Sequence, residues 1–434
     1  MKKLSLVATA VMGLASTTAM AQSNVTLYGL LDGGYNYVSG LKQGNISTIA
    51  SGIMEGSRFG LRGTEDIGGG YKAIFTLENR LELDTGSVTN RPNSGTQVPD
   101  RIASTVVSGV LASGLPLPPA TLNVLVPALV AGVNTQLATS AFGVNLGGNL
   151  FDRQAFAGLV TPFGAFTLGR QYTPGYLVVA TFDASQTQSS LAAGQVASLP
   201  AAFEIRRDNS IQYGIQASGV TATLMYSAGE NAVNNGKFIG GMVMYKTDVF
   251  SLGFGHNEKK NERGQQSLTN NLFGATVKVG PGTLYGLYST IKDDNASGIS
   301  SLGAGAAAAA VSNGVPAALS PAVAAAFQNS YNTAFRQDAR LMHVGYRLTT
   351  GPHTFVTAFN RLDDKRLVNA DTDSYGVTYT YALSKRTNLN TVLTRFNNKG
   401  QGQVAPGGNG FLGGVTSAAG VGSTNFALGI RHSF

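Results

Sequence analysis

The sequence predicts an all-β protein, a 16-stranded antiparallel transmembrane β-barrel, and three observations support this. Segments of roughly 9–12 residues alternate between apolar and polar side chains, close to the about 9–11 residues that a tilted membrane strand needs. Short turns alternate with long polar links along the chain. The composition is rich in glycine (56 of 434 residues) and poor in charge (12%), with a mean hydropathy of +0.05. Strands with one apolar face toward lipid and one polar face toward water would give a mean hydropathy near zero.

The composition argues against several other classes. There is no cysteine to build a disulfide scaffold. The 43% hydrophobic content is too high for a disordered chain. Repeated apolar runs of about 20 residues, which a polytopic helical membrane protein needs, are missing. The strands of a soluble β-sandwich or propeller also alternate between apolar and polar side chains. Three features favour the barrel: an N-terminus that resembles a signal peptide, long loops on one side only, and a terminal Phe434 that would close the barrel.

Residues 1–21 have the form of a secretory signal peptide. Lys2 and Lys3 precede the apolar stretch 4–15, and an A-x-A cleavage site follows at 19–21. The alternative is an N-terminal core helix. We expect a cleaved leader, a barrel domain over 22–434 and export to the bacterial outer membrane.

Strand-like alternation recurs through the remaining chain and is clearest in 220–228, 374–383 and 425–434. Short turns are expected within 65–70, 161–164, 218–219, 247–248, 280–282, 350–352 and 384–386. Longer links lie between them, for example 172–205 and 398–422. Seven short turns and eight long loops connect sixteen strands, and this asymmetry is typical of outer-membrane barrels with short periplasmic turns.

Alternation also assigns side chains to faces. If Phe59 and Leu61 face outward, then Arg58 and Arg62 face the lumen, and the same test turns Glu78 and Arg80 inward.

Two further arginines are placed by the same rule. An outward Phe156 turns Arg153 inward, and an outward Ile211 turns Arg206 inward together with Asp208.

Six segments resemble the Gram-negative general porins of β-proteobacterial type. They are NVTLYG (24–29) followed by Asp32, SRFGLRGTED (57–66), RQAFAGL (153–159), TLGRQY (167–172), LSKRT (383–387) and GIRHSF (429–434). The resemblance spans nearly the whole chain. It implies a homotrimer in contact with outer-membrane lipid and lipopolysaccharide, an inward-folded third loop, and a water-filled channel for passive diffusion of ions and small hydrophilic solutes.

In the resembled family, arginines on the wall face acidic residues on the third loop. Arg58, Arg153 and Arg206 match the wall arginines, and Arg62 and Arg80 share their face. The third loop offers few acids, namely Asp183 in its interior and Glu204 at its end. An excess of positive charge in a narrow channel predicts weak to moderate anion preference. For each arginine, a solvated or structural ion pair is the alternative.

Arg170 shares its face with Phe166 and Leu168 and should therefore point outward, near the extracellular end. An outward arginine is costly in lipid at depth and less so near the interface. Arg170 is therefore a candidate contact with a neighbouring subunit.

Two loops depart from the family by their length, about 81–150 and 292–337. Neither contains a clean apolar run of 18 residues, so we expect no membrane helix in them. Two interpretations of these loops are left open: helical caps over the pore mouth, and flexible surface insertions.

No pattern points to catalysis or to a cofactor. The four histidines, His256, His343, His353 and His432, lack metal-ligand spacing. The arginines spread over many strands, which argues against nucleic-acid binding. We expect no enzymatic activity, no cofactor and no metal. A barrel enzyme and an adhesin or structural role of the long loops are the alternatives.

Overall fold

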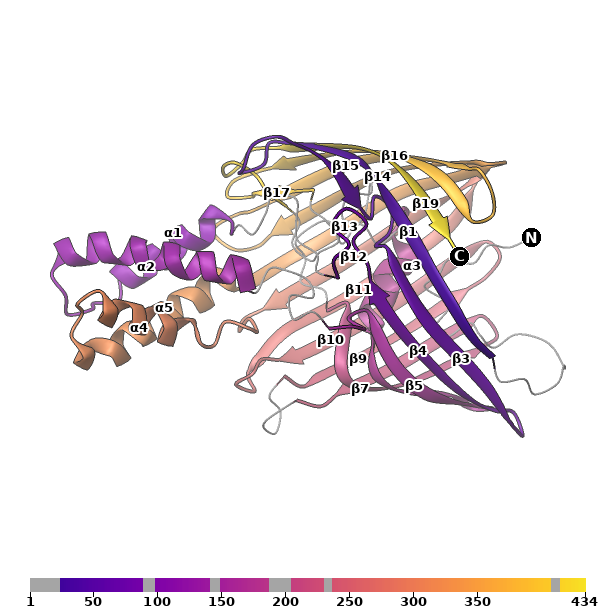
Figure 1. The fold of residues 1–434 in the computed structure, drawn as a ribbon, viewed down its shortest axis with the longest axis horizontal. Helices are drawn as coiled ribbons and strands as arrows, with labels where there is room; N and C mark the ends of the chain where they lie inside the picture. The colour runs from indigo at the N-terminus through magenta and orange to yellow at the C-terminus, as the bar shows by residue number, and fades with distance from the viewer. Residues whose placement is uncertain (1–23, 89–97, 141–148, 187–203, 230–235, 407–413) are drawn as a thin grey trace.

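The computed structural model describes residues 24–88, 98–140, 149–186, 204–229, 236–406 and 414–434; the predicted signal peptide lies outside them. One closed antiparallel sheet dominates the molecule (Figure 1). Of its 17 named strands, β2 (Ile46–Ser51) and β3 (Arg58–Gly68) both pair with β1 (Asn24–Ser39), end to end. They are two parts of one barrel strand, so the barrel has sixteen strands, which confirms the predicted number.

The other strands follow in chain order. They are β4 Tyr71–Arg80, β5 Gln154–Thr161, β6 Gly164–Tyr172, β7 Arg206–Ala217, β8 Val220–Ser227, β9 Phe238–Lys246, β10 Phe250–Lys260, β11 Gln266–Val279, β12 Gly282–Asp293, β13 Gln337–Thr350, β14 His353–Asp364, β15 Thr372–Ala382, β16 Thr387–Asn398 and β19 Ser423–Ser433. Each pairs with its neighbours in sequence, and β19 closes the ring against β1.

Large apolar side chains lie on the outer face and small polar ones inside. Val377 and Leu393 are directly opposite each other on β15 and β16, and 52% and 49% of their surfaces are exposed. On the same two strands, Ser374 and Thr394 are buried on the opposite, inner face. This is the period of two that the sequence predicts.

The last residue completes the ring. Gly29 and Phe434 exchange two backbone hydrogen bonds of 3.1 Å. A Cβ atom on Gly29 would lie 2.2 Å from the Phe434 ring, so only glycine leaves room for the ring in its present position.

Seven turns of two to four residues join strands at one end of the barrel, as predicted. In the turn between β7 and β8, Ser218 and Gly219 both have positive φ (49° and 82°), as a two-residue hairpin of type I′ requires. The longer loops lie at the other end, which is the extracellular end of an outer-membrane barrel.

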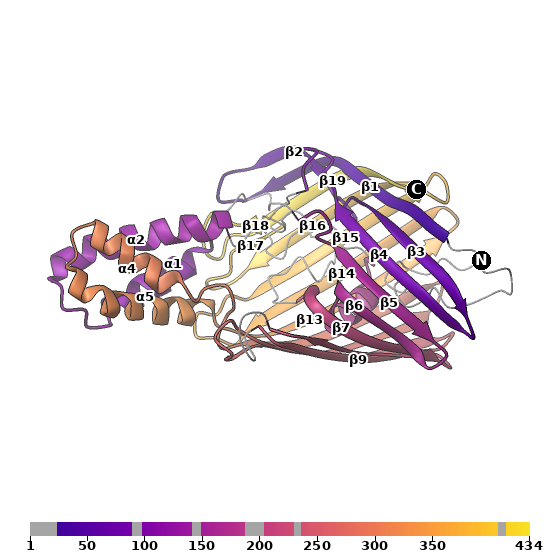
Figure 2. The same cartoon turned by 60° about the horizontal axis from the view of Figure 1, so that its bottom comes forward.

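The two long insertions form one helical bundle outside the barrel (Figures 1 and 2). The second loop supplies α1 (Asp100–Leu111) and α2 (Pro119–Ser140). The sixth loop supplies α4 (Leu302–Ser312), the short helix η3 (Ala317–Leu319) and α5 (Ser320–Phe335). Both insertions are therefore helical over these residues.

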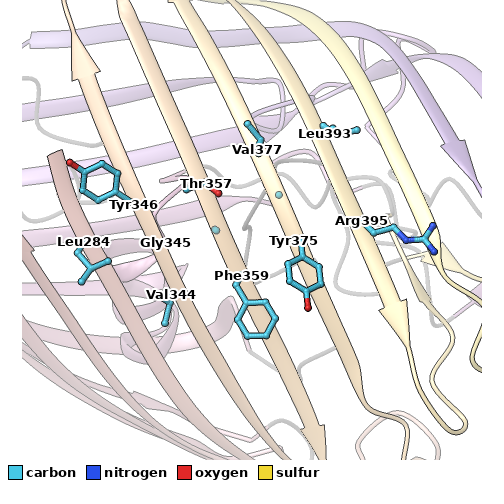
Figure 3. Close-up of a pocket in the computed structure, with 12 residues that line it drawn as sticks. Leu284, Val344, Gly345, Tyr346, Thr357, Phe359, Tyr375, Val377, Leu393 and Arg395 are labelled. Carbon is cyan, nitrogen blue, oxygen red and sulfur yellow. The ribbon is translucent and has the colours of Figure 1, made fainter. Parts of the chain in front are cut away.

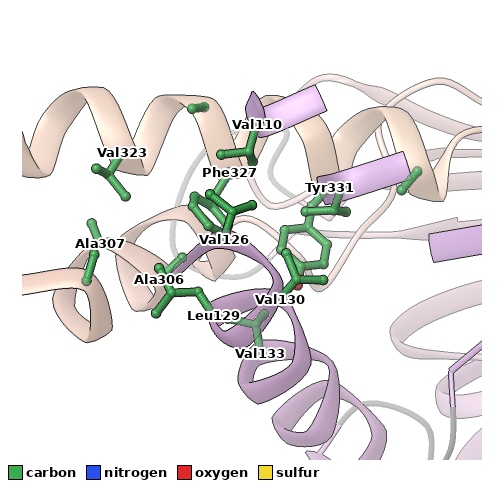
Figure 4. Close-up of a cluster of buried hydrophobic side chains, with 14 of the residues drawn as sticks. Val110, Val126, Leu129, Val130, Val133, Ala306, Ala307, Val323, Phe327 and Tyr331 are labelled. Carbon is green, nitrogen blue, oxygen red and sulfur yellow. The ribbon is translucent and has the colours of Figure 1, made fainter. Parts of the chain in front are cut away.

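The bundle has its own core, in which side chains of all four long helices meet (Figure 4). Val110, Val126, Ala306, Phe327 and Tyr331 are buried there. Apolar residues at helical spacing on both insertions explain this packing.

Contrary to the sequence analysis, the second loop does contain an apolar stretch of membrane-spanning length, which forms helix α2. Its window Pro119–Leu137 has a mean hydropathy of 1.3 and is long and apolar enough to cross a membrane, by length and composition alone. Within the described residues it is the one helix of that kind. Leu129 and Val133 pack into the bundle core instead.

The third loop enters the barrel. Its helix α3 (Pro174–Phe182) is capped at its N-terminus by Thr173, whose Oγ1 accepts the N–H of Tyr176 at 3.2 Å. Apolar side chains of α3 pack on inward-facing residues of the wall. Phe182 lies so close to Gly274 that a Cβ atom there would be 2.1 Å from its ring. A short hairpin, β17 (Val404–Ala405) with β18 (Gly414–Val415), lies in the last loop.

Candidate functional site

A buried network of arginines and carboxylates lies on the inner wall, built from β3, β4 and the residues just before β5. Arg58 is 2% exposed and donates from Nη2 to Glu55 Oε2 at 2.7 Å. Its Nε also lies 3.6 Å from Glu78 Oε2. Glu55 occupies the interval between β2 and β3, where the strand leaves the sheet.

Glu78 on β4 is the common partner of several side chains. Arg153 Nε donates to its Oε1 at 2.7 Å, and the Tyr28 hydroxyl donates to its Oε2 at 3.1 Å. Both of its oxygens are therefore held by the wall.

Tyr172 joins Arg206 to this group. The hydroxyl of Tyr172 accepts hydrogen bonds from Nη2 of Arg153 at 3.0 Å and from Nη2 of Arg206 at 3.1 Å. The Arg206 guanidinium also lies over the Tyr172 ring, with Cζ 4.6 Å from the centroid.

Two further ion pairs extend the network. Arg80 Nε donates to Asp152 Oδ2 at 3.1 Å, and Arg431 on β19 donates to Glu55 Oε1 at 2.9 Å. Arg80 also lies 3.7 Å from Glu82, the second residue after β4. Burial raises the pKa of Glu82 to about 7.

We call this set the arginine network: Arg58, Arg80, Arg153, Arg206 and Arg431 with Glu55, Glu78, Glu82 and Asp152. Four guanidinium groups pair with the four carboxyl groups and Arg206 joins them through Tyr172, so this set keeps one net positive charge when every carboxyl group is ionised. The acids come from the wall and the second loop rather than from the third loop.

The two acids of the third loop that were expected to face the wall arginines have other partners. Asp183 is fully buried, its Oδ1 accepts the N–H and the hydroxyl of Ser185 at 2.9 and 2.8 Å, and it lies 4.0 Å from His343 Nε2. Glu204 pairs with Lys259 on β10 and lies 3.7 Å from Arg207. These contacts of the two acids lie outside the arginine network.

The strand β13 also holds the inner end of the third loop. The Ala184 N–H donates to His343 Nε2 at 3.0 Å, and Arg347 Nη1 donates to the carbonyl of Ser185 at 3.0 Å. The loop is thus fixed to the wall at the end of α3.

A family model described as Gram-negative porin matches residues 8–401 of this barrel-forming chain. The chain belongs to the Gram-negative porin family. It is accordingly a protein of the bacterial outer membrane.

Two curated relatives match shorter segments of this porin. Outer membrane porin protein 32 of Delftia acidovorans is 46% identical over 88 residues, 20% of this chain and 25% of the relative. An outer membrane porin protein of Bordetella pertussis is 37% identical over 101 residues, 20% of this chain and 26% of the relative. The chain thus spans about a quarter of the length of the curated relatives it matches.

Solved structures share the fold over nearly the full length. An anion-selective porin from Comamonas acidovorans has a TM-score of 0.64 at 22% identity, covering 95% of this chain and 100% of that one. OmpT of Vibrio cholerae in its trimer form has a TM-score of 0.56 at 13% identity, covering 95% and 99%. OmpF of Salmonella typhi in complex with daunomycin has 0.55 at 14%, covering 94% and 97%.

Register places the remaining candidate residues of the porin. Arg62 shares the inner face with Arg58 but is exposed, and its guanidinium lies 5.1 Å from the centroid of the Tyr28 ring. Arg170 is opposite Ala155, on the outer face as expected, and Nη1 donates to Asp208 of the same chain at 2.6 Å.

Two face assignments were wrong. Phe156 lies opposite Thr76, on the face of Glu78, so it points inward and is buried. Arg153 reaches Glu78 because it precedes β5, where the alternation of that strand does not apply. In β7 the register shifts, so Asp208 and Asn209 together oppose Arg170, and Asn209 has a φ of 52°. Because of this bulge, Asp208 pairs with the outward Arg170 and does not share the inner face with Ser210, so its predicted inward position was wrong.

The sequence reasoning missed Glu55, Glu82, Asp152 and Arg431 as members of the network, and Tyr172 as the residue that joins Arg206 to it. Inward alternation had already marked Glu78, so a search for its counter-charges would have extended the set. Within the described residues, no group of three or more histidine or acidic residues is arranged to hold a metal ion.

Proposed function

We propose that this porin forms a water-filled channel for passive diffusion of ions and small hydrophilic solutes, with weak to moderate anion preference. The arginine network carries this proposal, because it places five guanidinium groups against four carboxyl groups on the inner wall. Charges in a narrow channel with low-dielectric walls act on passing ions through their field. The structurally similar porin from Comamonas acidovorans is described as anion-selective, which supports the same sign of ion selectivity.

The pore constriction of this proposal lies between the arginine network and the third loop. Arg58, Arg80, Arg153 and Arg206 form its basic side, and Arg62 follows on the same wall toward the short turns. Asp183 and Glu204 remain the acids of the third loop in the proposal, although Asp183 contacts His343 and Ser185, and Glu204 contacts Lys259 and Arg207. We expect their effect on ion selectivity to be smaller than that of Glu78.

Reversal potential across a KCl gradient in planar bilayers tests the proposal. The wild type should prefer chloride, and Arg58→Ala should shift the reversal potential toward cation preference, because Glu55 and Glu78 lose one counter-charge. Arg395→Ala is a matched control on the outer face, where Arg395 lies opposite Tyr375. A cation-selective wild type would overturn the selectivity, and the absence of stepwise conductance would overturn the channel.

The assembly we propose is a homotrimer in contact with outer-membrane lipid and lipopolysaccharide, with Arg170 at a subunit contact. The trimer form of the Vibrio cholerae relative supports it. Because Arg170 also pairs with Asp208 of its own chain, two variants are needed. Arg170→Ala should lower the trimer's dissociation temperature in detergent more than Asp208→Asn does. Equal effects would reduce Arg170 to an ion pair within one chain.

We propose no catalytic role. Nδ1 of each histidine lies within hydrogen-bond distance of an amide or hydroxyl oxygen: Asn271 for His256, Asn360 for His343, Tyr379 for His353 and Thr387 for His432. The barrel enzyme is therefore not favoured. Absence of stepwise conductance together with hydrolysis by the purified protein would reverse this ranking.

A further inference from the structure

A groove of roughly 450 Å³ lies on the outer face of the barrel, across β12 to β16 (Figure 3). We call it the outer groove. Its walls include Val344, Phe359, Tyr375, Val377 and Leu393, and Arg395 lies at its border.

The register explains why a groove forms there. Phe359 and Tyr375 are directly opposite on β14 and β15, and their ring centroids are 5.1 Å apart. Between these rows, Gly345, Ala358 and Gly376 lie opposite one another and also line the groove. The side-chain positions of this row face the lumen, where a Cβ atom on Gly345 would lie 2.4 Å from Ala184. The floor of the groove is therefore the backbone of these strands, between two rows of outward-facing side chains.

One cation borders this apolar surface. Arg395 is opposite Tyr375, three residues before β16 ends at Asn398 on the extracellular side. Its Nε donates to Asn397 Oδ1 at 3.0 Å and its Nη1 to Thr424 Oγ1 at 2.9 Å. Both partners are neutral, so these contacts leave the charge of Arg395 without compensation.

The depth of Arg395 fits a place near the outer surface of the membrane. An outward arginine is costly at the bilayer midplane and far less so near the interface. Guanidinium groups bind phosphate through two parallel hydrogen bonds, so an anionic head group is the ligand that matches this cation. The groove then extends from the cation along the apolar wall.

We propose that the outer groove binds an acyl chain of a phosphorylated glycolipid of the outer leaflet, with Arg395 paired to its phosphate. This inference deepens the proposed contact with lipopolysaccharide and is independent of the proposed ion selectivity. The apolar walls select the chain, and the single border cation selects the phosphate.

Binding of diphosphorylated lipid A to the purified porin, titrated by native mass spectrometry, tests the proposal. Arg395→Gln should weaken binding about tenfold, the range expected for a hydrogen bond to a charged group. Arg386→Gln makes the same change in the short turn between β15 and β16, away from the groove, and should leave binding unchanged. Equal affinity of Arg395→Gln and wild type would overturn the proposal.

A second comparison identifies the contact. Dephosphorylated lipid A should bind the wild type about as weakly as intact lipid A binds Arg395→Gln, and the two losses should not add, because one contact is removed in both cases. Additive losses would place the phosphate elsewhere. Val377→Phe, which adds volume in the groove on the outer face, should reduce binding of intact and dephosphorylated lipid A alike.

Other occupants give different results. If phosphatidylglycerol binds as tightly as lipid A, the site takes phospholipid and the glycolipid assignment is overturned. If Arg395→Gln dissociates the trimer while lipid binding is unchanged, a second copy of the chain covers the groove. Conductance and reversal potential of Arg395→Gln should match the wild type, so failure of this proposal is distinguishable from failure of the channel.

Discussion

Arg153 Nε and Glu78 Oε1 are 2.7 Å apart inside the barrel, and this ion pair joins the second loop to β4. Neither group is more than 5% exposed in its side chain. Buried pairs of this kind are costly to break, because the remaining partner keeps an uncompensated charge. The network therefore has consequences for both stability and ion selectivity.

Glu78→Gln removes the carboxylate that Arg58 and Arg153 share. We expect the reversal potential in a KCl gradient to move further toward chloride, opposite to the shift of Arg58→Ala. Barrel stability in detergent should fall by about 3–5 kcal/mol, the usual cost of breaking a buried pair. A shift toward cation preference would contradict the sign of the network's field.

Ion preference should depend on pH through Glu82. Burial raises its pKa to about 7, so it is largely ionised at pH 8 and largely neutral at pH 6. Loss of this negative charge beside Arg80 should increase chloride preference as the pH falls, with a midpoint near 7.

The matched control is Glu82→Gln, which should show the low-pH selectivity throughout this range. The measurement is reversal potential at fixed KCl gradient from pH 8 to 6. An equal pH response in wild type and Glu82→Gln would assign the titration to another group.

Gly274→Ala should narrow the channel. A Cβ atom at this position would lie 2.1 Å from the ring of Phe182, so α3 has to move away from β11 and into the lumen. Single-channel conductance should fall, while the barrel still folds. Gly286→Ala on β12 is a matched control, because its nearest contact would be 4.0 Å away. Equal conductance in both variants would show that the Phe182 ring moves without the helix.

Gly29→Ala should weaken barrel closure, because the new methyl group overlaps the Phe434 ring. Overpacking of this kind typically costs about 1–3 kcal/mol. Folding into detergent micelles, followed by urea titration, gives the free energy of unfolding. Phe434→Ala in the same chain should remove most of the added cost of Gly29→Ala, and strict additivity would indicate another cause.

Phe327→Ala should loosen the helical bundle and leave the barrel intact. Phe327 is 1% exposed in the bundle core, and truncation of a buried phenylalanine costs about 3–5 kcal/mol. Hydrogen exchange should rise in α1, α2, α4 and α5 but not in the strands. Val124→Ala on the exposed face of α2 is the control. Unchanged hydrogen exchange in Phe327→Ala would mean that the helices are held by their attachment to the barrel rather than by the bundle core.

The strands were predictable because alternation and turn residues act locally. Each of the seven short turns was found from its own few residues, and the pairs Phe59 with Arg58 and Leu77 with Glu78 have the faces that the period of two gives. The bulge at Asn209 was not predictable, because one extra residue in β7 leaves no mark on the apolar pattern. Phe156 was assigned to the outer face because its side chain is apolar, but it faces the lumen.

The partners in the site were harder to predict than its arginines. Arg431 meets Glu55 across 376 residues of sequence, and Asp152 reaches Arg80 across 72. Such pairs depend on closure of the whole ring rather than on any local pattern. The bundle was left open for the same reason, since its halves lie in two separate insertions.

The origin of the bundle core also sets an order for folding. Val126 and Phe327 meet in this core, and eight barrel strands, β5 to β12, lie between them in the chain. Helices of 11 to 22 residues are marginal without tertiary contacts. Contacts between distant segments form only after the loop-closure entropy between them has been paid. Completion of the bundle therefore comes late, and protection of α1 from proteases would report that those strands are already in register.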